Sequence, residues 1–349
     1  MRSGRIPVLV LAGFLGSGKT TLLNHLLAHS LDVRIGVIVN DFGSVGVDAM
    51  LIGGQADGVV SLGNGCLCCA VGEQGVGPLL DQLAAPGSGL DVIIIEASGI
   101  AEPGALVQLV LSSGNPHTTF GGLVGVVDLV EFEDARRRHP ELDRHVALAD
   151  LVVLTKADRV DSARLAELRR LCRQLNPRAP LIPATHGEVD PRVLFDIEVV
   201  PGRQLMLGQT AATHGHGHDQ DDSHGHGENH SGHLHAAYQS LAFHTDRPLD
   251  PRRLVDWLDA RPEGVYRIKG FVHFGSPGHR QRFLLHAVGR YLRFDRSPWP
   301  RGQPRRTALE LIGTGMVAQP LHAGLQACER DDPPDDEAML PVLRYTFTG

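Results

Sequence analysis

A glycine-rich run near the start of the chain contains the residues with the clearest chemical purpose. It reads Gly13-Phe-Leu-Gly-Ser-Gly-Lys19-Thr20, follows the aliphatic run Val8–Ala12 and leads into an amphipathic stretch. A strand, a glycine-rich turn and a helix in this order form a loop whose backbone amides bind phosphates. We expect the Lys19 ammonium to contact the β- and γ-phosphates and the Thr20 hydroxyl to bind Mg²⁺. The residues predicted to bind the nucleotide in this loop are Gly13, Gly16, Ser17, Gly18, Lys19, Thr20 and Thr21.

Two acidic residues that follow aliphatic runs are candidates for catalysis. Glu96 stands where P-loop proteins place the carboxylate that holds or orients Mg²⁺ and its water molecules, and Gly99 lets the backbone approach the γ-phosphate. Asp41 follows the second aliphatic run, where it is a candidate to face the metal or the attacking water; a simple turn is the alternative. We therefore predict Lys19, Glu96 and Asp41 as the catalytic residues.

The sequence Thr155-Lys156-Ala157-Asp158 follows the buried run Leu151–Leu154. The Asp158 carboxylate can accept the two protons on the Watson–Crick edge of guanine, and the Lys156 stem can lie along the ring. Because the segment follows a strand and comes in the right order, it favours GTP over ATP as the ligand.

Three thiols, Cys66, Cys68 and Cys69, lie within four residues. Thiolates select soft or borderline ions, and three of them leave the fourth position of a tetrahedral Zn²⁺ centre open, as a site that passes on its metal requires. A redox pair and a chance grouping in a buried turn are the alternatives. A disulfide between the adjacent Cys68 and Cys69 would be strained, which favours the metal.

A histidine-rich segment supplies a second set of candidate metal ligands. Neutral imidazole suits Zn²⁺, Ni²⁺, Co²⁺ and Cu²⁺, and a flexible chain can present several overlapping sites of low specificity. We interpret the segment as an arm that collects or buffers metal; a polar spacer is the alternative. Its histidines are His214, His216, His218, His224, His226, His230, His233 and His235.

The elements that must position these residues divide the chain into three parts. Aliphatic runs alternating with helix-like stretches predict, over residues 1–205, a parallel sheet covered on both faces. Residues 206–236 are too polar to offset their ordering entropy and predict a mobile linker. Residues 237–349 predict a small α+β domain, with strands near 238–244, 265–274, 282–294 and 307–312 and helices near 251–259 and 317–328. The strands predicted in the first part are Val8–Ala12, Arg34–Asn40, Val59–Leu62, Val92–Ile95, Leu123–Val127 and Leu151–Leu154.

The composition excludes several classes of protein. The chain has 349 residues, a net charge of −7, 42% hydrophobic and 21% charged residues, which excludes collagen-like, coiled-coil and wholly disordered chains. No apolar run approaches the roughly 20 residues of a membrane span, and the net negative charge gives no general attraction to nucleic acid. Five cysteines, three of them clustered, do not suit a disulfide framework, so we expect a reducing, cytoplasmic location with neither membrane nor nucleic acid as partner.

Taken in order, the phosphate loop, the Gly-Cys-x-Cys-Cys segment, the Glu-x-x-Gly, the Thr-Lys-x-Asp, the histidine-rich linker and the small C-terminal domain resemble the CobW-type family of P-loop GTPase metallochaperones. The resemblance spans nearly the whole chain. It implies a doubly wound, mostly parallel α/β P-loop domain, a CobW C-terminal domain, and slow GTP hydrolysis coupled to metal delivery. It also implies that Cys66, Cys68 and Cys69 are the internal metal ligands. Asp41, Ser44 and Thr155 depart from the pattern, in place of a glutamate, an acidic residue and an asparagine.

The functional hypothesis is a metallochaperone in which GTP and Mg²⁺ order the loops carrying Asp41, the cysteines and Glu96, and so change the geometry of a zinc site. The expected partners are GTP, zinc or a related ion such as Co²⁺ or Ni²⁺, and a metal-requiring client protein; a homodimer is left open. One alternative is a GTPase that inserts cobalt or iron, in cobalamin synthesis or nitrile hydratase activation. Another is a non-enzymatic zinc store or sensor.

Overall fold

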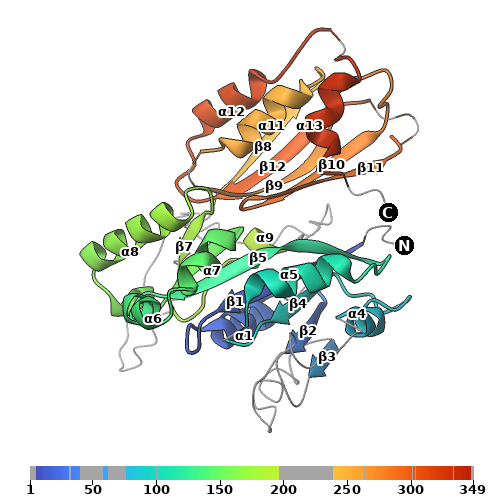
Figure 1. The fold of residues 1–349 in the computed structure, drawn as a ribbon. Coiled ribbons are helices and arrows are strands. Elements are labelled where there is room, and N and C mark those ends of the chain that lie inside the picture. The colour runs from blue at the N-terminus through green and yellow to red at the C-terminus, as the bar shows by residue number, and fades with distance from the viewer. Residues whose placement is uncertain are drawn as a thin grey trace, which may run out of the picture.

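Among the residues that the structure describes, seven strands form a parallel sheet in the N-terminal part of the chain (Figure 1). The computed structural model describes residues 5–30, 33–39, 58–61, 76–99, 101–195, 239–262, 264–300, 302, 304–332 and 334–346. Every neighbouring pair in the sheet is parallel. In sheet order the strands are β3 (Gly58–Ser61), β2 (Ile35–Val39), β4 (Val92–Glu96), β1 (Ile6–Gly13), β5 (Thr118–Asp128), β6 (Leu151–Thr155) and β7 (Leu181–Pro183).

Alternate residues of these strands enter cores on opposite faces of the sheet, because successive side chains of a strand point in opposite directions. Leu9 and Leu11 of β1 pack with α1 (Lys19–His29) and α9 (Pro191–Leu194). Val8 and Val10 pack on the other face, with α4 (Gly77–Leu83) and α5 (Pro103–Ser112). On that second face α6, α7 and α8 cover β5 and β6; they span Phe132–Arg138, Leu142–Leu148 and Ser162–Leu175.

In the described C-terminal part of the chain, five antiparallel strands form the second sheet. One side carries a core of aromatic and aliphatic residues that includes Phe243, Phe274, Phe283 and Phe294. In sheet order the strands are β11 (Tyr291–Ser297), β10 (Arg282–Val288), β9 (Val265–Val272), β12 (Thr307–Gly313) and β8 (Gln239–Thr245). The helices against this core are α11 (Pro251–Asp259), α12 (Ala318–Gln326), η2 (Glu337–Met339) and α13 (Leu340–Leu343).

The predicted fold class is confirmed: a doubly wound parallel sheet is followed by a smaller α+β domain. Three details of the prediction were wrong. β5 begins five residues earlier, at Thr118, and β7 was not predicted. The single strand expected at 282–294 is a hairpin, β10 and β11, because Gly289 adopts a left-handed conformation (φ +50°) and turns the chain back.

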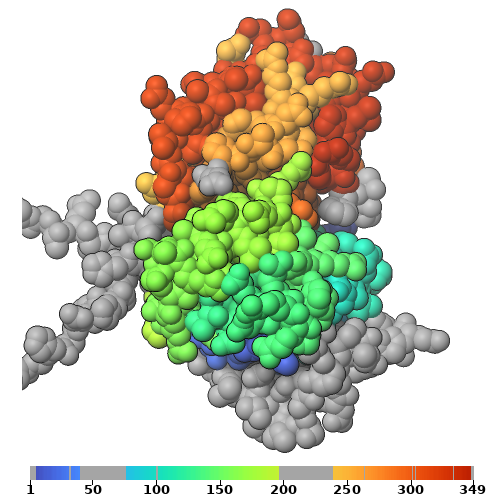
Figure 2. Space-filling model, turned by 60° about the vertical axis from the view of Figure 1, so that its left-hand side comes forward, coloured from blue at the N-terminus to red at the C-terminus, as the bar shows by residue number. Residues whose placement is uncertain are grey.

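The two sheets contact each other through the β10–β11 turn and α9. The Arg290 backbone N–H donates to the Asp150 carbonyl (2.9 Å), and the Phe120 and Tyr291 rings meet edge to face. Tyr266 and Ile312 of the second sheet join the core that contains α1. Figure 2 shows the two parts in direct contact, with the green surface of residues near 150–195 against the orange surface of the C-terminal part. No helix in the described part of the chain is long and apolar enough to cross a membrane.

Candidate nucleotide site

The glycine-rich loop joins the end of β1 to the start of α1. Gly16 (φ +72°) and Gly18 (φ +93°) adopt left-handed conformations that favour glycine. Gly13 lies against β5, where a Cβ would meet the Val126 carbonyl oxygen at 2.4 Å. The loop therefore needs its glycines both to turn and to lie close to the sheet.

The Lys19 ammonium lies across the loop. It donates to the carbonyl oxygens of Gly13 (3.0 Å) and Phe14 (3.1 Å), and the residue is buried. The hydroxyl of Ser17 is also buried and has no hydrogen-bond partner within the described residues. Buried donors normally have an acceptor, so the Ser17 hydroxyl suits the oxygens of a phosphate chain. The Lys19 ammonium suits them as well, because charged oxygens are stronger acceptors than carbonyls.

Thr20 and Glu96 meet beside the loop although they are 76 positions apart in the sequence. The Thr20 hydroxyl donates to Glu96 Oε1 at 2.6 Å, and Glu96 is only 3% exposed. β4 pairs with β1 so that Glu96 lies opposite Leu11, and this register places the carboxylate next to the phosphate loop. A hydroxyl and a carboxylate are hard oxygen donors of the kind that Mg²⁺ prefers, so the residues present fit this ion.

Gly99 packs against the phosphate loop from the other side. A Cβ at this position would lie 2.7 Å from the Leu15 backbone nitrogen, well below any ordinary contact. Any larger residue would push the loop away from the segment after β4. The sequence-based role of Gly99, a close approach of backbone to the γ-phosphate, is compatible with this position.

Thr155 ties the end of β6 to the phosphate loop. Its buried hydroxyl lies 2.6 Å from the Ser17 carbonyl oxygen and 3.2 Å from that of Val127, and it donates to the nearer one. The threonine that replaces an asparagine in the family pattern thus has a structural contact of its own.

Lys156 and Asp158 directly follow the end of the same strand, β6. Lys156 has a left-handed backbone (φ +58°), which is uncommon for a residue with a side chain and occurs often at functional sites. Its ammonium contacts the Asp128 carboxylate at 2.5 Å. Asp158 lies in the short helix η1 (Ala157–Arg159), and its side chain is 30% exposed, which leaves the carboxylate open to a ligand.

Sequence reasoning missed Asp128, at the end of β5. One oxygen of its carboxylate accepts the Val130 N–H (2.9 Å) and the other accepts from Lys156. Asp128 thereby positions the lysine stem predicted to lie along the base. The available signal was an acidic residue at the end of the aliphatic run Leu123–Val127, the same pattern that drew attention to Glu96.

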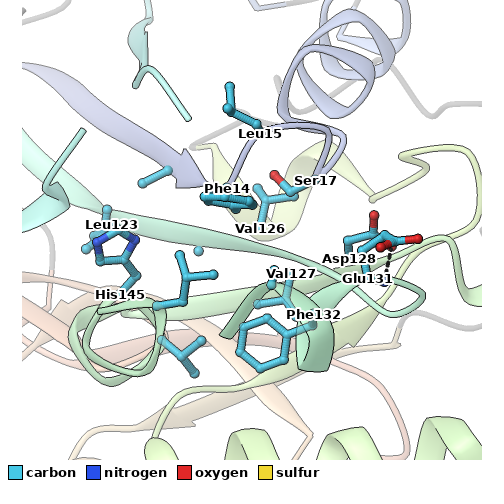
Figure 3. A pocket seen from close by; sticks show the side chains of 16 residues that line it. Phe14, Leu15, Ser17, Leu123, Val126, Val127, Asp128, Glu131, Phe132 and His145 are labelled. Carbon is cyan, nitrogen blue, oxygen red and sulfur yellow. Dashed lines mark hydrogen bonds between the residues drawn. The ribbon is translucent and has the colours of Figure 1, made fainter. Parts of the chain in front are cut away.

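A small cavity lies between the phosphate loop and helices α6 and α7 (Figure 3). Its volume is about 40 Å³, and most of its lining is apolar, including Phe14, Val126 and Phe132. The polar His145 at its edge contacts Glu102 (3.5 Å), while burial lowers the pKa of this imidazole. The cavity is too small for a nucleotide, which needs several hundred Å³, and we interpret it as a packing gap.

The remaining predicted site residues lie outside the described part of the chain. They are Asp41, Cys66, Cys68, Cys69, His214, His216, His218, His224, His226, His230, His233 and His235. Among the described residues, no group of three or more His, Cys, Asp or Glu side chains is arranged to hold a metal. Cys172 and Cys328 are buried free thiols, and burial raises the pKa of each to about 11.

The parallel sheet, the loop between β1 and α1 and the neighbouring carboxylate define a P-loop nucleotide-binding domain. The sequence model of the CobW/HypB/UreG nucleotide-binding domain matches residues 7–183, and that of the cobalamin synthesis protein CobW C-terminal domain matches residues 238–329. The chain is 34% identical over 348 residues to the zinc chaperone CobW of Pseudomonas aeruginosa, with 88% of each chain covered. It is 30% identical over 346 residues to the zinc chaperone CobW of a Sinorhizobium species, with 89% of this chain and 93% of the relative covered.

A third relative, the zinc-regulated GTPase metalloprotein activator 1 of Schizosaccharomyces pombe, is 31% identical over 194 residues, which cover 53% of this chain and 47% of that protein. The chain therefore belongs to the CobW family, with a CobW-type nucleotide-binding domain followed by a CobW C-terminal domain.

Proposed function

We propose that this protein is a GTP-hydrolysing chaperone that binds zinc and delivers it to a client protein in the cytoplasm. The observation that carries the proposal is the Thr20–Glu96 hydrogen bond beside the phosphate loop, because it brings a hydroxyl and a carboxylate to the place where a triphosphate and its ion must be held. The names of the relatives, zinc chaperone and zinc-regulated GTPase, support the choice of cargo and nucleotide.

The phosphate loop binds the triphosphate through its backbone amides and the Lys19 ammonium. Lys19 exchanges its two loop carbonyl partners for phosphate oxygens, which are stronger acceptors because they are charged. Asp158 accepts the protons of guanine, and Lys156, positioned by Asp128, lies along the base.

Thr20 and Glu96 are the residues that hold or orient Mg²⁺, with Asp41 as a further candidate. Held by these residues, the ion would supply positive charge that offsets the negative charge on the phosphate oxygens. Glu96 keeps the Thr20 hydroxyl in place before the ion arrives, since the two groups are already 2.6 Å apart.

Zinc is the cargo, and Cys66, Cys68 and Cys69 are its proposed ligands, with the histidine-rich segment 214–235 as a collecting arm. The binding free energies of nucleotide and metal are linked, so a factor by which GTP changes zinc affinity is the factor by which zinc changes GTP affinity. A site made of thiolates with one open position can pass its ion to a client. The proposed boundaries of the GTPase domain, the linker and the C-terminal domain are 1–205, 206–236 and 237–349.

The test measures zinc affinity of the untagged full chain by competition with a chromogenic chelator, in GDP and in a non-hydrolysable GTP analogue. We expect different affinities in the two states, and loss of the tight site when the three cysteines are changed to serine. Equal affinities would remove the coupling, and an unchanged tight site in the triple variant would remove the cysteine assignment.

A single-turnover GTPase assay tests the enzyme separately. We expect Lys19→Ala to abolish hydrolysis, whereas Lys269→Ala, a lysine of the second sheet, leaves it unchanged. Hydrolysis at the original rate in Lys19→Ala would refute the assignment of the phosphate loop.

A further inference from the structure

A polar cavity of about 460 Å³ lies between the two domains. One wall is the end of α8 and the segment that leads into β7. The other wall is the end of α11, residues 260–262 and 264, the start of β9, and the β10–β11 turn. Figure 2 shows the green and orange surfaces that meet in this region. The volume lies within the range of sites for small molecules.

The lining of this interdomain cavity is rich in arginine. Each domain contributes two guanidinium groups, and Asp259 is the one carboxylate among the described lining residues. Asp259 already faces Arg344 at 3.8 Å. The described lining residues therefore carry four positive charges and one negative charge. The four are Arg173, Arg178, Arg261 and Arg290.

Among the described residues, three of the four guanidinium groups form no ion pair, although the charge of the nearby Asp150 acts on two of them, Arg261 and Arg290. Arg173 donates to the Ala179 carbonyl (2.6 Å), which fixes its direction. For Arg178, Arg261 and Arg290 the described residues provide no side-chain hydrogen bond and no ion pair. Burial lowers the pKa of Arg261 to about 10, in spite of the opposing fields of Asp259 and Asp150. Arg178 and Arg290 are exposed and Arg261 is half-buried, so their guanidinium groups can donate charge-assisted hydrogen bonds to an anion in the cavity.

We propose that this interdomain cavity binds a small phosphate-bearing anion, held by Arg178 from the nucleotide-binding domain and by Arg261 and Arg290 from the C-terminal domain. Phosphate carries up to two charges and several acceptor oxygens, so it can bind several guanidinium groups at once. A single carboxylate, in contrast, usually pairs with one guanidinium group. Binding across the gap also joins the two domains.

The proposed site is separate from the phosphate loop. In a parallel sheet all strands start at one edge and end at the other. Asp150 lies at the contact between the two sheets and directly precedes β6, and Pro180 lines the cavity and directly precedes β7. The phosphate loop, in contrast, follows the end of β1. The two sites thus lie at opposite edges of the sheet, and an anion in the cavity acts on domain contact without competing for the nucleotide.

The test is calorimetric titration of the full chain with pyrophosphate, inorganic phosphate and citrate. It is run in a Lys19→Ala background, which removes binding at the phosphate loop. We expect pyrophosphate to bind to one site, more tightly than citrate. In the double variant Arg178→Gln/Arg290→Gln, both of whose side chains are exposed, the affinity should fall at least about tenfold.

The matched control is Arg170→Gln/Arg252→Gln, which removes one exposed arginine from α8 and one from α11 outside the cavity lining. We expect this control to bind pyrophosphate as the parent does. Absence of pyrophosphate binding in the Lys19→Ala protein would overturn the proposal, and so would equal affinity in the two double variants. Tighter binding of citrate than of pyrophosphate would overturn the assignment to phosphate.

Discussion

The replacement Thr155→Val tests how the end of β6 supports the phosphate loop. The Thr155 hydroxyl donates to the Ser17 carbonyl at 2.6 Å, and both residues are buried, so water cannot replace the bond. Valine keeps the shape of the side chain but leaves the carbonyl without its donor. Loss of one partner of a buried hydrogen bond costs about 1–3 kcal/mol.

The lost hydrogen bond destabilises the ordered conformation of the phosphate loop, which is the conformation that binds nucleotide. If the whole cost is expressed as loop disorder, the GDP dissociation constant rises by about 5-fold to 150-fold, since each 1.4 kcal/mol is about a factor of ten. The free energy of unfolding in urea falls by about 1–3 kcal/mol for the same reason. Nucleotide affinity is measured by fluorescence titration with a labelled guanine nucleotide.

Thr155→Ser is the matched control, because it keeps the hydroxyl and removes only a methyl group. We expect its nucleotide affinity to stay near that of the original protein. The reasoning is refuted if Thr155→Val binds nucleotide and unfolds as the original does, or if serine and valine weaken binding equally.

Three further predictions concern the rest of the chain. A Cβ at Gly289 would lie 1.5 Å from the Asp150 carbonyl oxygen, so Gly289→Ala should lower the free energy of unfolding by about 2 kcal/mol in urea, more than Gly315→Ala, a left-handed glycine (φ +61°) in open space. Burial raises the pKa of Asp150 from 3.8 to about 6, so the unfolded chain loses this proton first and stability falls as pH rises from about 4 to about 6. Denaturant titrations across that range should show that the free energy of unfolding falls less in Asp150→Asn than in the original protein, by up to about 3 kcal/mol. The buried Cys172 and Cys328 thiols, with pKa values near 11, should react with a thiol reagent only on unfolding, and a rapid reaction that disappears in Cys172→Ser/Cys328→Ser would contradict this.

Much of the nucleotide-binding domain could be predicted because its signals are local. A strand, a glycine-rich turn and a helix are consecutive in the chain, and the left-handed conformations at Gly16 and Gly18 are those that the motif requires. Aliphatic runs predicted a parallel sheet because both faces of its strands are covered. The hairpin at Gly289 was missed because only Gly289 and Arg290 separate β10 from β11, so the two apolar-rich strands were interpreted as one.

The contacts that complete the candidate site depend on strand order. Thr20 meets Glu96 because β4 lies beside β1, and Lys156 meets Asp128 because β6 lies beside β5. These pairs are separated by 76 and 28 positions, and nothing in the spacing of the residues specifies them. Asp128 shares with Glu96 its place at the end of an aliphatic run, but its contact with Lys156 follows from strand order alone.

The sequence by itself determined the class of fold, the phosphate loop and the family, because each rests on residues that are neighbours in the chain or on a pattern repeated along it. Only the tertiary structure decided which side chains meet: the hydroxyl of Thr155 and the loop carbonyl, the arginines of two domains around one cavity, and the Gly289 turn against Asp150. Local patterns follow from backbone geometry and the burial of apolar side chains, whereas the meeting of distant residues follows from strand order and domain packing, which the whole chain fixes at once.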